Sequence, residues 1–169
     1  MRYLWILILI LIAAGILVSQ IFFTVDETNQ AIVLQFGEPI RTVRNPGLHT
    51  KLPFIQNLII LEKRVLSSDA PPQEYLTTDK KRLVVDHVTR WRIEDPLLFF
   101  LAVGTEAVAR ARLDDIGFSE LREELAKVDF VDIISTEREN IMETVAGSAE
   151  EKAREFGIDI VDVRVKRAD

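Results

Sequence analysis

At 169 residues the chain has room for one ordinary domain or two small ones, once any membrane segment is set aside. The formal net charge of the chain is −6, and without Arg2, which precedes the apolar N-terminal run, the rest of the chain carries −7. This negative charge argues against binding to nucleic acid and against electrostatic adhesion to anionic lipid. The absence of cysteine excludes disulfide frameworks, thiol catalysis and thiolate zinc sites.

Residues 3–23 (YLWILILILIAAGILVSQIFF) form an uncharged run of 21 residues. A helix of that length, rising about 1.5 Å per residue, spans roughly 30 Å and predicts a transmembrane anchor over residues 1–23. The alternative is a cleavable signal peptide, whose apolar region usually covers about 7 to 15 residues and ends at a small-residue cleavage site. Arg2 precedes the run and Asp26 and Glu27 follow it, so the positive-inside rule places the N-terminus in the cytoplasm.

The segment after the anchor is rich in strand-forming residues. The second half of residues 25–36 is β-like and ends at the turn-forming triplet Gly37-Glu38-Pro39. Residues 58–61, with Val65 and Leu66, predict another strand, which the stretch 67–72 (SSDAPP) cannot continue.

The most regular strand pattern covers residues 83–93, LVVDHVTRWRI. Every second residue from Leu83 to Ile93, including His87, falls on one side, while charged residues dominate the other. Asp95-Pro96 is expected to end this strand.

The apolar period then changes to nearly four, which is typical of helices. One helix is expected over about 106–128, interrupted near Gly117, with Ser119 as the N-cap of its second half and Leu121, Leu125 and Val128 on its buried face. Strands followed by helices, without regular alternation, predict an α+β fold.

A second amphipathic helix is expected within residues 132–157, with Gly157 at the C-cap position. Val161, Val163 and Val165 alternate with charged residues and predict a final strand. The apolar positions of the helix are Ile134, Ile141, Val145, Ala149, Ala153 and Phe156.

Candidate catalytic groups do not assemble into a known motif. His49 and His87, the two histidines, lie in different elements, and His87 is expected to be a hydrogen-bonded core residue. The acidic pairs, such as Asp114-Asp115, are sequence neighbours whose side chains diverge on a helix. We therefore expect no catalytic, cofactor or metal site and no enzyme activity.

The stretch 45–57 (NPGLHTKLPFIQN) reads as a stiff corner. Pro46-Gly47 is a turn dipeptide, and Pro53 biases Leu52 toward an extended conformation. The apolar side chains of the corner either enter the membrane interface, with Lys51 reaching the headgroups, or fill the core of the small domain.

Four stretches carry a resemblance to a known family: residues 35–57, 77–100 (TTDKKRLVVDHVTRWRIEDPLLFF), 112–125 and 157–169. Together they closely resemble the SPFH or band 7 family, which includes stomatins, prohibitins, flotillins and the bacterial modulators of the FtsH protease. The resemblance implies a β-rich SPFH1 subdomain over 24–78 and an α+β SPFH2 subdomain over 79–169. Members normally continue beyond the position of Asp169 into a long helix, which this sequence does not contain.

The resemblance also implies a function. A single-pass protein of the bacterial inner membrane, with its SPFH subdomains in the periplasm, would alternate with an HflK-like SPFH subunit in a large cage. That cage would enclose an FtsH-type AAA protease and regulate the access of membrane-protein substrates. The alternatives are a stomatin-like organiser of membrane microdomains or regulator of channels, and a membrane-tethered hydrolase whose carboxylates converge only in the fold.

Two sets of site residues follow from these hypotheses. The expected membrane contacts are Trp5, Phe22, Phe23, Leu48, Lys51, Leu52, Phe54 and Ile55. The expected subunit interface consists of charged residues that could pair across a ring-forming contact: Arg110, Arg112, Arg122, Glu123 and Glu124.

Overall fold

A computed structural model of the chain describes residues 2–129 and 138–168, except for some side chains of helix 2–21 and the side chains of 138, 167 and 168. The chain forms two compact units, Met1–Lys63 and Arg64–Asp169. The division precedes the boundary expected between residues 78 and 79, because the strands of residues 66–76 pair with a strand of the second unit.

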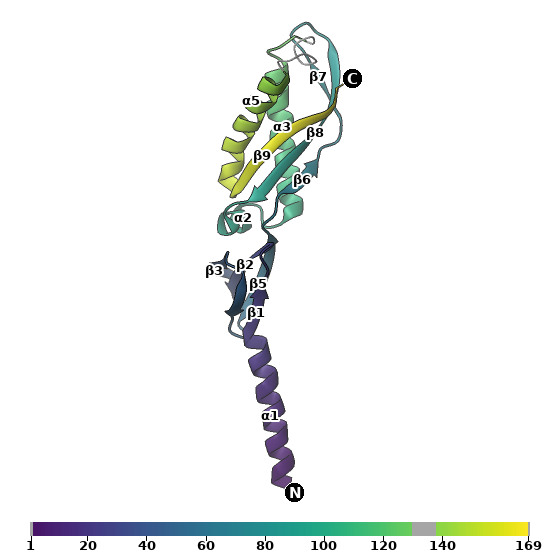
Figure 1. The fold of residues 1–169 in the computed structure, drawn as a ribbon. Helices are drawn as coiled ribbons and strands as arrows, with labels where there is room; N and C mark the ends of the chain where they lie inside the picture. Colours follow the sequence, from purple (N-terminus) through teal and green to yellow (C-terminus); the bar gives the residue numbers. More distant parts are fainter. Residues whose placement is uncertain (1, 130–137, 169) are drawn as a thin grey trace. The chain divides into compact units, whose positions relative to one another are not determined.

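The first unit begins with helix α1, Arg2–Ile21. Among the described residues, no helix combines the length and the apolar character needed to cross a membrane. The helix leads directly into strand β1, Phe22–Val25 (Figure 1).

Two small antiparallel sheets make up the rest of this unit. In one, β1 pairs with β4; in the other, β2 lies between β3 and β5. The expected strand within 25–36 is confirmed as β2, in which residues 30–34 are all buried. Val25, Ala31, Val33 and Val43 form the core, against which Phe23 and Leu58 pack. The strands are β2 (Asn29–Gln35), β3 (Glu38–Val43), β4 (Gly47–Thr50) and β5 (Gln56–Glu62).

The turn between β2 and β3 lies earlier than expected. Only Phe36 and Gly37 connect the two strands, and both have positive φ, as in a type I′ hairpin turn. Glu38 and Pro39 already belong to β3, where the pairing slips at Leu34↔Pro39. Pro39 is tolerated because β3 is an edge strand.

In the second unit, the expected strand at 83–93 is confirmed as β8, Arg82–Ile93. Along one side β8 pairs with β9, and along the other with two short strands in succession, β6 and β7. Residues 67–69, expected to interrupt strand structure, instead belong to β6, whereas residues 70–72 do break it. The other strands are β6 (Leu66–Asp69), β7 (Gln73–Leu76) and β9 (Ile158–Ala168).

Helices α3, Glu106–Leu125, and α5, Arg138–Ala153, pack beside this sheet (Figure 1). Their buried residues recur every fourth position, from Ala109 to Leu125 in α3 and from Ile141 to Ala153 in α5. α3 contacts β8, and α5 contacts β9. On the buried side of β8, Leu83, Val85, His87, Thr89, Trp91 and Ile93 are at most 3% exposed. The core of the second unit therefore lies between the helices and the sheet.

Two expectations about the helix predicted over 106–128 are wrong. α3 runs through Gly117 without interruption, and its N-cap is Thr105, whose hydroxyl accepts the N–H of Val108, rather than Ser119. Gly117 is present because the His87 ring occupies the space of a side chain: a Cβ at this position would lie 2.5 Å from His87 Nε2. The short helix α2, Pro96–Ala102, capped by Asp95, was not expected at all.

The helix expected within 132–157 and the last strand are confirmed, with irregularities at the helix end and in the strand pairing. A 3-10 turn, Arg154–Phe156, follows α5, and Gly157 adopts the left-handed conformation; the expected helical residues 132–137, including Ile134, lie outside the described residues. In β9 the pairing with β8 slips between Ile160 and Asp162. Val161 is consequently half exposed rather than sharing a buried face with Val163.

Candidate functional site

The corner at residues 45–57 is built onto the end of α1. β4 pairs antiparallel with β1 from Phe22↔Thr50 to Val25↔Gly47, and the Lys51 N–H donates to the Ile21 carbonyl over 2.7 Å. The Nε2 atom of His49 lies 3.0 Å from the carbonyl oxygen of Asn45, and the ring centroids of His49 and Phe23 are 5.7 Å apart. These contacts give His49 a structural position. Among the described residues, no group of His, Asp or Glu side chains is arranged to hold a metal ion.

A tight turn follows β4 and presents Phe54 to solvent. The Gln56 N–H donates to the Leu52 carbonyl, and the Leu52 N–H donates to Gln56 Oε1 over 2.8 Å. Phe54 at the tip has φ of 68° and is 82% exposed. A bulky residue in this region of backbone space is strained, and its exposed ring gains no core packing in return.

We expect Phe54→Asn to raise the free energy of unfolding by about 0.5 to 1 kcal/mol, because asparagine tolerates the left-handed conformation. Denaturant unfolding in mild detergent measures the change. Phe36→Asn is a matched control, since Phe36 is also 82% exposed and has φ of 53°. A loss of stability in the Phe54 variant alone would mean that its ring makes a stabilising contact.

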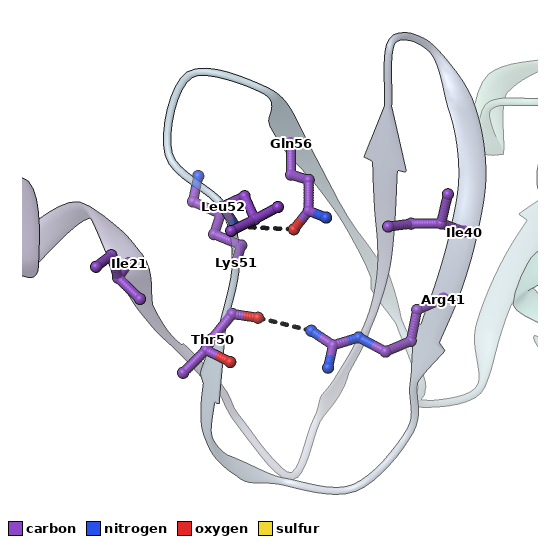
Figure 2. A pocket seen from close by; sticks show the side chains of 7 residues that line it. All are labelled: Ile21, Ile40, Arg41, Thr50, Lys51, Leu52 and Gln56. Carbon is purple, nitrogen blue, oxygen red and sulfur yellow. Dashed lines mark hydrogen bonds between the residues drawn. The ribbon is translucent and has the colours of Figure 1, made fainter.

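Beside this turn lies a cavity of about 570 Å³ (Figure 2). Arg41 enters it from β3 and donates through a guanidinium nitrogen to the Thr50 carbonyl over 2.6 Å. Gln56 closes another side, where its Nε2 donates to Gln35 Oε1 over 3.3 Å. No carboxylate lines this cavity, so it contains no acid and base pair of the kind that the hydrolase hypothesis requires. The lining residues are Ile21, Ile40, Arg41, Thr50, Lys51, Leu52 and Gln56.

Most of the expected membrane contacts are exposed. The four apolar residues of the corner do not fill the core of the unit, and Lys51 is half-buried. Phe23 differs from the others, because it packs against the core formed by Val25 and its neighbours. The sequence analysis did not include Phe36, Ile40 and Arg41 among the site residues, because it predicted no strand at the position of β3. The exposed residues of the set are Trp5, Phe22, Leu48, Leu52, Phe54 and Ile55.

The five expected interface charges all lie on α3, but they are not equivalent. Arg110 pairs with Glu106 over 3.7 Å, while Glu123 and Glu124 both bind Lys127, at 3.0 and 2.7 Å. The Lys127 ammonium holds the pKa of the exposed Glu123 carboxyl below its usual value. Arg112 and Arg122 are exposed and form no ion pair among the described residues.

The charge pair that links the two long helices was not predicted. Glu120 is only 4% exposed, and its carboxylate accepts a hydrogen bond from Lys152 of α5. That bond raises the pKa of the Lys152 ammonium. Glu120 precedes Leu121 in the four-residue buried series of α3, which was the available sequence signal for its position.

His87 is buried as expected, but it is not hydrogen-bonded. Neither ring nitrogen has a partner among the described residues, and the ring packs edge-on against Phe118 with centroids 5.2 Å apart. Burial lowers the pKa of this histidine, and the nearby charges of Asp114 and Asp86 oppose the shift only in part. Asp114 is itself held by the Ser68 hydroxyl at 2.8 Å. His87 is therefore a neutral ring in the core.

Acidification is expected to destabilise the protein through His87. The unfolded chain takes up a proton near pH 6.5, whereas the folded chain resists protonation until a lower pH. Stability contributed above pH 6.5 is consequently lost as the pH falls toward the folded pKa, by at most about 1.4 kcal/mol per pH unit. Chemical unfolding as a function of pH measures the slope. His87→Asn should flatten it, and parallel slopes would show that His87 titrates alike in both states.

Comparison with known sequences adds the decisive observation. The model of the SPFH domain, or band 7 family, matches residues 23–169, which is most of the chain. The chain belongs to the SPFH/band 7 family. The α+β character of the second unit agrees with this membership.

Among curated SPFH relatives, the chain is similar to proteins named HflC. It is 32% identical to Protein HflC of Buchnera aphidicola subsp. Acyrthosiphon pisum, over 90% of this chain and 56% of that protein. It is 31% identical to Protein HflC of Haemophilus influenzae, over 94% and 57%. It is 34% identical to the Modulator of FtsH protease HflC of Escherichia coli K12, over 78% and 42%. The chain spans about half the length of these curated relatives.

Proposed function

We propose that this chain is the SPFH portion of an HflC-type scaffold subunit that modulates an FtsH-type AAA protease. The observation that carries the proposal is the family match over residues 23–169, together with relatives named as HflC. The Escherichia coli relative is named as a modulator of FtsH protease. The same role here is steric: SPFH units that tile side by side decide which membrane proteins reach the protease.

The proposal includes anchoring of the subunit through α1 in the bacterial inner membrane. Its support is the uncharged run of residues 3–23 and the exposure of large apolar side chains such as Trp5, which is 72% exposed. With the N-terminus in the cytoplasm, the rest of the chain after α1 lies in the periplasm. The exposed apolar side chains of the 45–57 corner then contact the membrane interface.

Orientation is directly testable because the chain has no natural cysteine. A Ser119→Cys variant places one thiol on an exposed position of α3. A membrane-impermeant maleimide should label it in cells whose outer membrane alone is permeabilised. Labelling only after the inner membrane is disrupted would place these units in the cytoplasm.

Assembly with an HflK-like subunit is part of the same proposal. Arg112 and Arg122 are the two expected interface residues whose side chains form no ion pair in the described part of the chain, so they are available to an acidic partner surface. A double charge reversal, Arg112→Glu with Arg122→Glu, should shrink the assembly, whereas reversal of Arg90, exposed on β8, should not.

The deciding experiment is to solubilise the natural full-length protein in mild detergent, measure its size and identify the proteins that travel with it. We expect a very large particle that contains a second SPFH subunit and an AAA protease. A homo-oligomer without protease would instead support the stomatin-like organiser, and a lone monomer would contradict the cage.

A further inference from the structure

The cavity beside the 45–57 corner is lined by two basic residues, Arg41 and Lys51, which have no carboxylate partner among the described residues. Arg41 donates one hydrogen bond to the Thr50 carbonyl, and the side chain of Lys51 has no partner among the described residues. Neither forms an ion pair within the described part of the chain, although the protein as a whole is acidic. Since a guanidinium has five N–H donors, most of those of Arg41 are still available to a ligand.

The same cavity has an apolar side. Ile21, at the end of α1, together with Ile40 and Leu52 lines it alongside the two cations. The carbonyl of Ile21, at the negative end of the helix dipole, is covered by the Lys51 N–H, which reduces its repulsion of an anion. The ligand that suits this lining has an anionic group and an apolar body.

We propose that this cavity binds the phosphate of an anionic phospholipid headgroup through Arg41 and Lys51, while the apolar part of the lipid lies against Ile21 and Leu52. The planar guanidinium fork matches two phosphate oxygens, and the lysine supplies a point charge. The inference rests on the proposed anchoring of α1, which would bring the cavity to the level of the headgroups. The net negative charge of the chain opposes diffuse attraction to anionic membranes, so retention of lipid depends on this local site.

The test is lipid retention by the full chain. We would reconstitute it into vesicles containing equal parts of phosphatidylcholine and phosphatidylglycerol, extract it gently and weigh the protein with its bound lipid by native mass spectrometry. The expected result is preferential retention of phosphatidylglycerol at a saturable stoichiometry. Each of Arg41→Gln and Lys51→Gln should reduce the preference about tenfold, the usual effect of one charge-assisted hydrogen bond.

Lys63→Gln is the matched control. It removes the same charge as Lys51→Gln, but Lys63 follows β5 at the end opposite to Gln56. Lys51→Gln is the more telling variant, since the Lys51 side chain makes no contact whose loss would unfold the corner. Equal retention of both lipids by the wild type, or an equal loss in the Lys63 variant, would overturn the headgroup site.

Two further arms separate the possible sources of failure. Addition of inorganic phosphate without lipid should give no bound adduct, and a phosphate adduct that is lost in the Arg41→Gln variant would assign the cavity to a free anion. Flotation with vesicles of phosphatidylcholine alone tests the anchor. A chain that floats but shows no lipid preference would overturn the headgroup site only, whereas a chain that does not float would remove both the anchor and the site.

Discussion

Gly157→Ala is expected to destabilise the protein by about 3 kcal/mol or more, the largest loss among the glycine-to-alanine substitutions. Gly157 has φ of 69°, and a Cβ there would lie 2.5 Å from the Asp95 carbonyl oxygen and 2.9 Å from the Phe99 backbone nitrogen. Those two atoms form the first hydrogen bond of α2, so neither can move without disturbing that helix. The Gly157 carbonyl also accepts the N–H groups of Glu94 and Asp95.

Two other glycines separate the causes of this effect. Gly104 has φ of 75°, but a Cβ there would make only an ordinary van der Waals contact with its surroundings. Gly104→Ala therefore reports the backbone strain alone, a loss of about 1 kcal/mol in stability. Gly147 lies in α5 with open space around it, and Gly147→Ala should stabilise the protein by about 0.5 to 1 kcal/mol. Thermal or denaturant unfolding of the three variants measures the series. Equal losses at positions 104 and 157 would show that crowding against α2 contributes nothing.

Gly117→Ala should also destabilise, by about 1 to 3 kcal/mol, even though alanine is the better helix former. Its Cβ would lie 2.5 Å from His87 Nε2, and the His87 ring is fully buried with Phe118 at its edge. The ring cannot step aside within a packed core, so α3 must move away from the sheet.

The cause can be isolated with a double-mutant cycle. His87→Ala removes the ring and leaves room for the new methyl group, so Gly117→Ala should cost much less in that background. Unfolding free energies of the four proteins give the coupling energy. Additive costs would mean that Gly117 matters for a reason other than the histidine.

The contrast between Gly117 and β8 shows what the sequence could and could not reveal. Strict alternation from Leu83 to Ile93 identified β8 and its buried face, because period-two burial leaves a direct trace in the residue order. A glycine within a helical pattern predicts a break, as at Gly117. The close approach of Gly117 to His87 leaves no local pattern, because it joins residues 30 positions apart.

Some residues of the candidate site could likewise be predicted from the sequence, and others could not. The apolar residues of the 45–57 corner and Lys51 could be named from turn chemistry alone. Arg41 could not, because its place in the cavity depends on how β3 lies against the segment after β4. The Lys152–Glu120 pair was hidden for a similar reason, as it joins two helices whose packing the sequence does not state.

The ladder between β1 and β4 has a mechanical consequence. β1 continues α1 directly, and its four residues pair with β4 from Phe22↔Thr50 to Val25↔Gly47. A pull along α1 therefore loads these pairs together in shear instead of opening them one at a time, and the bond from Lys51 to Ile21 adds a further tie at the end of the helix. Force applied to the N-terminal helix is thus transmitted to the folded unit through a ladder rather than through a slack tether.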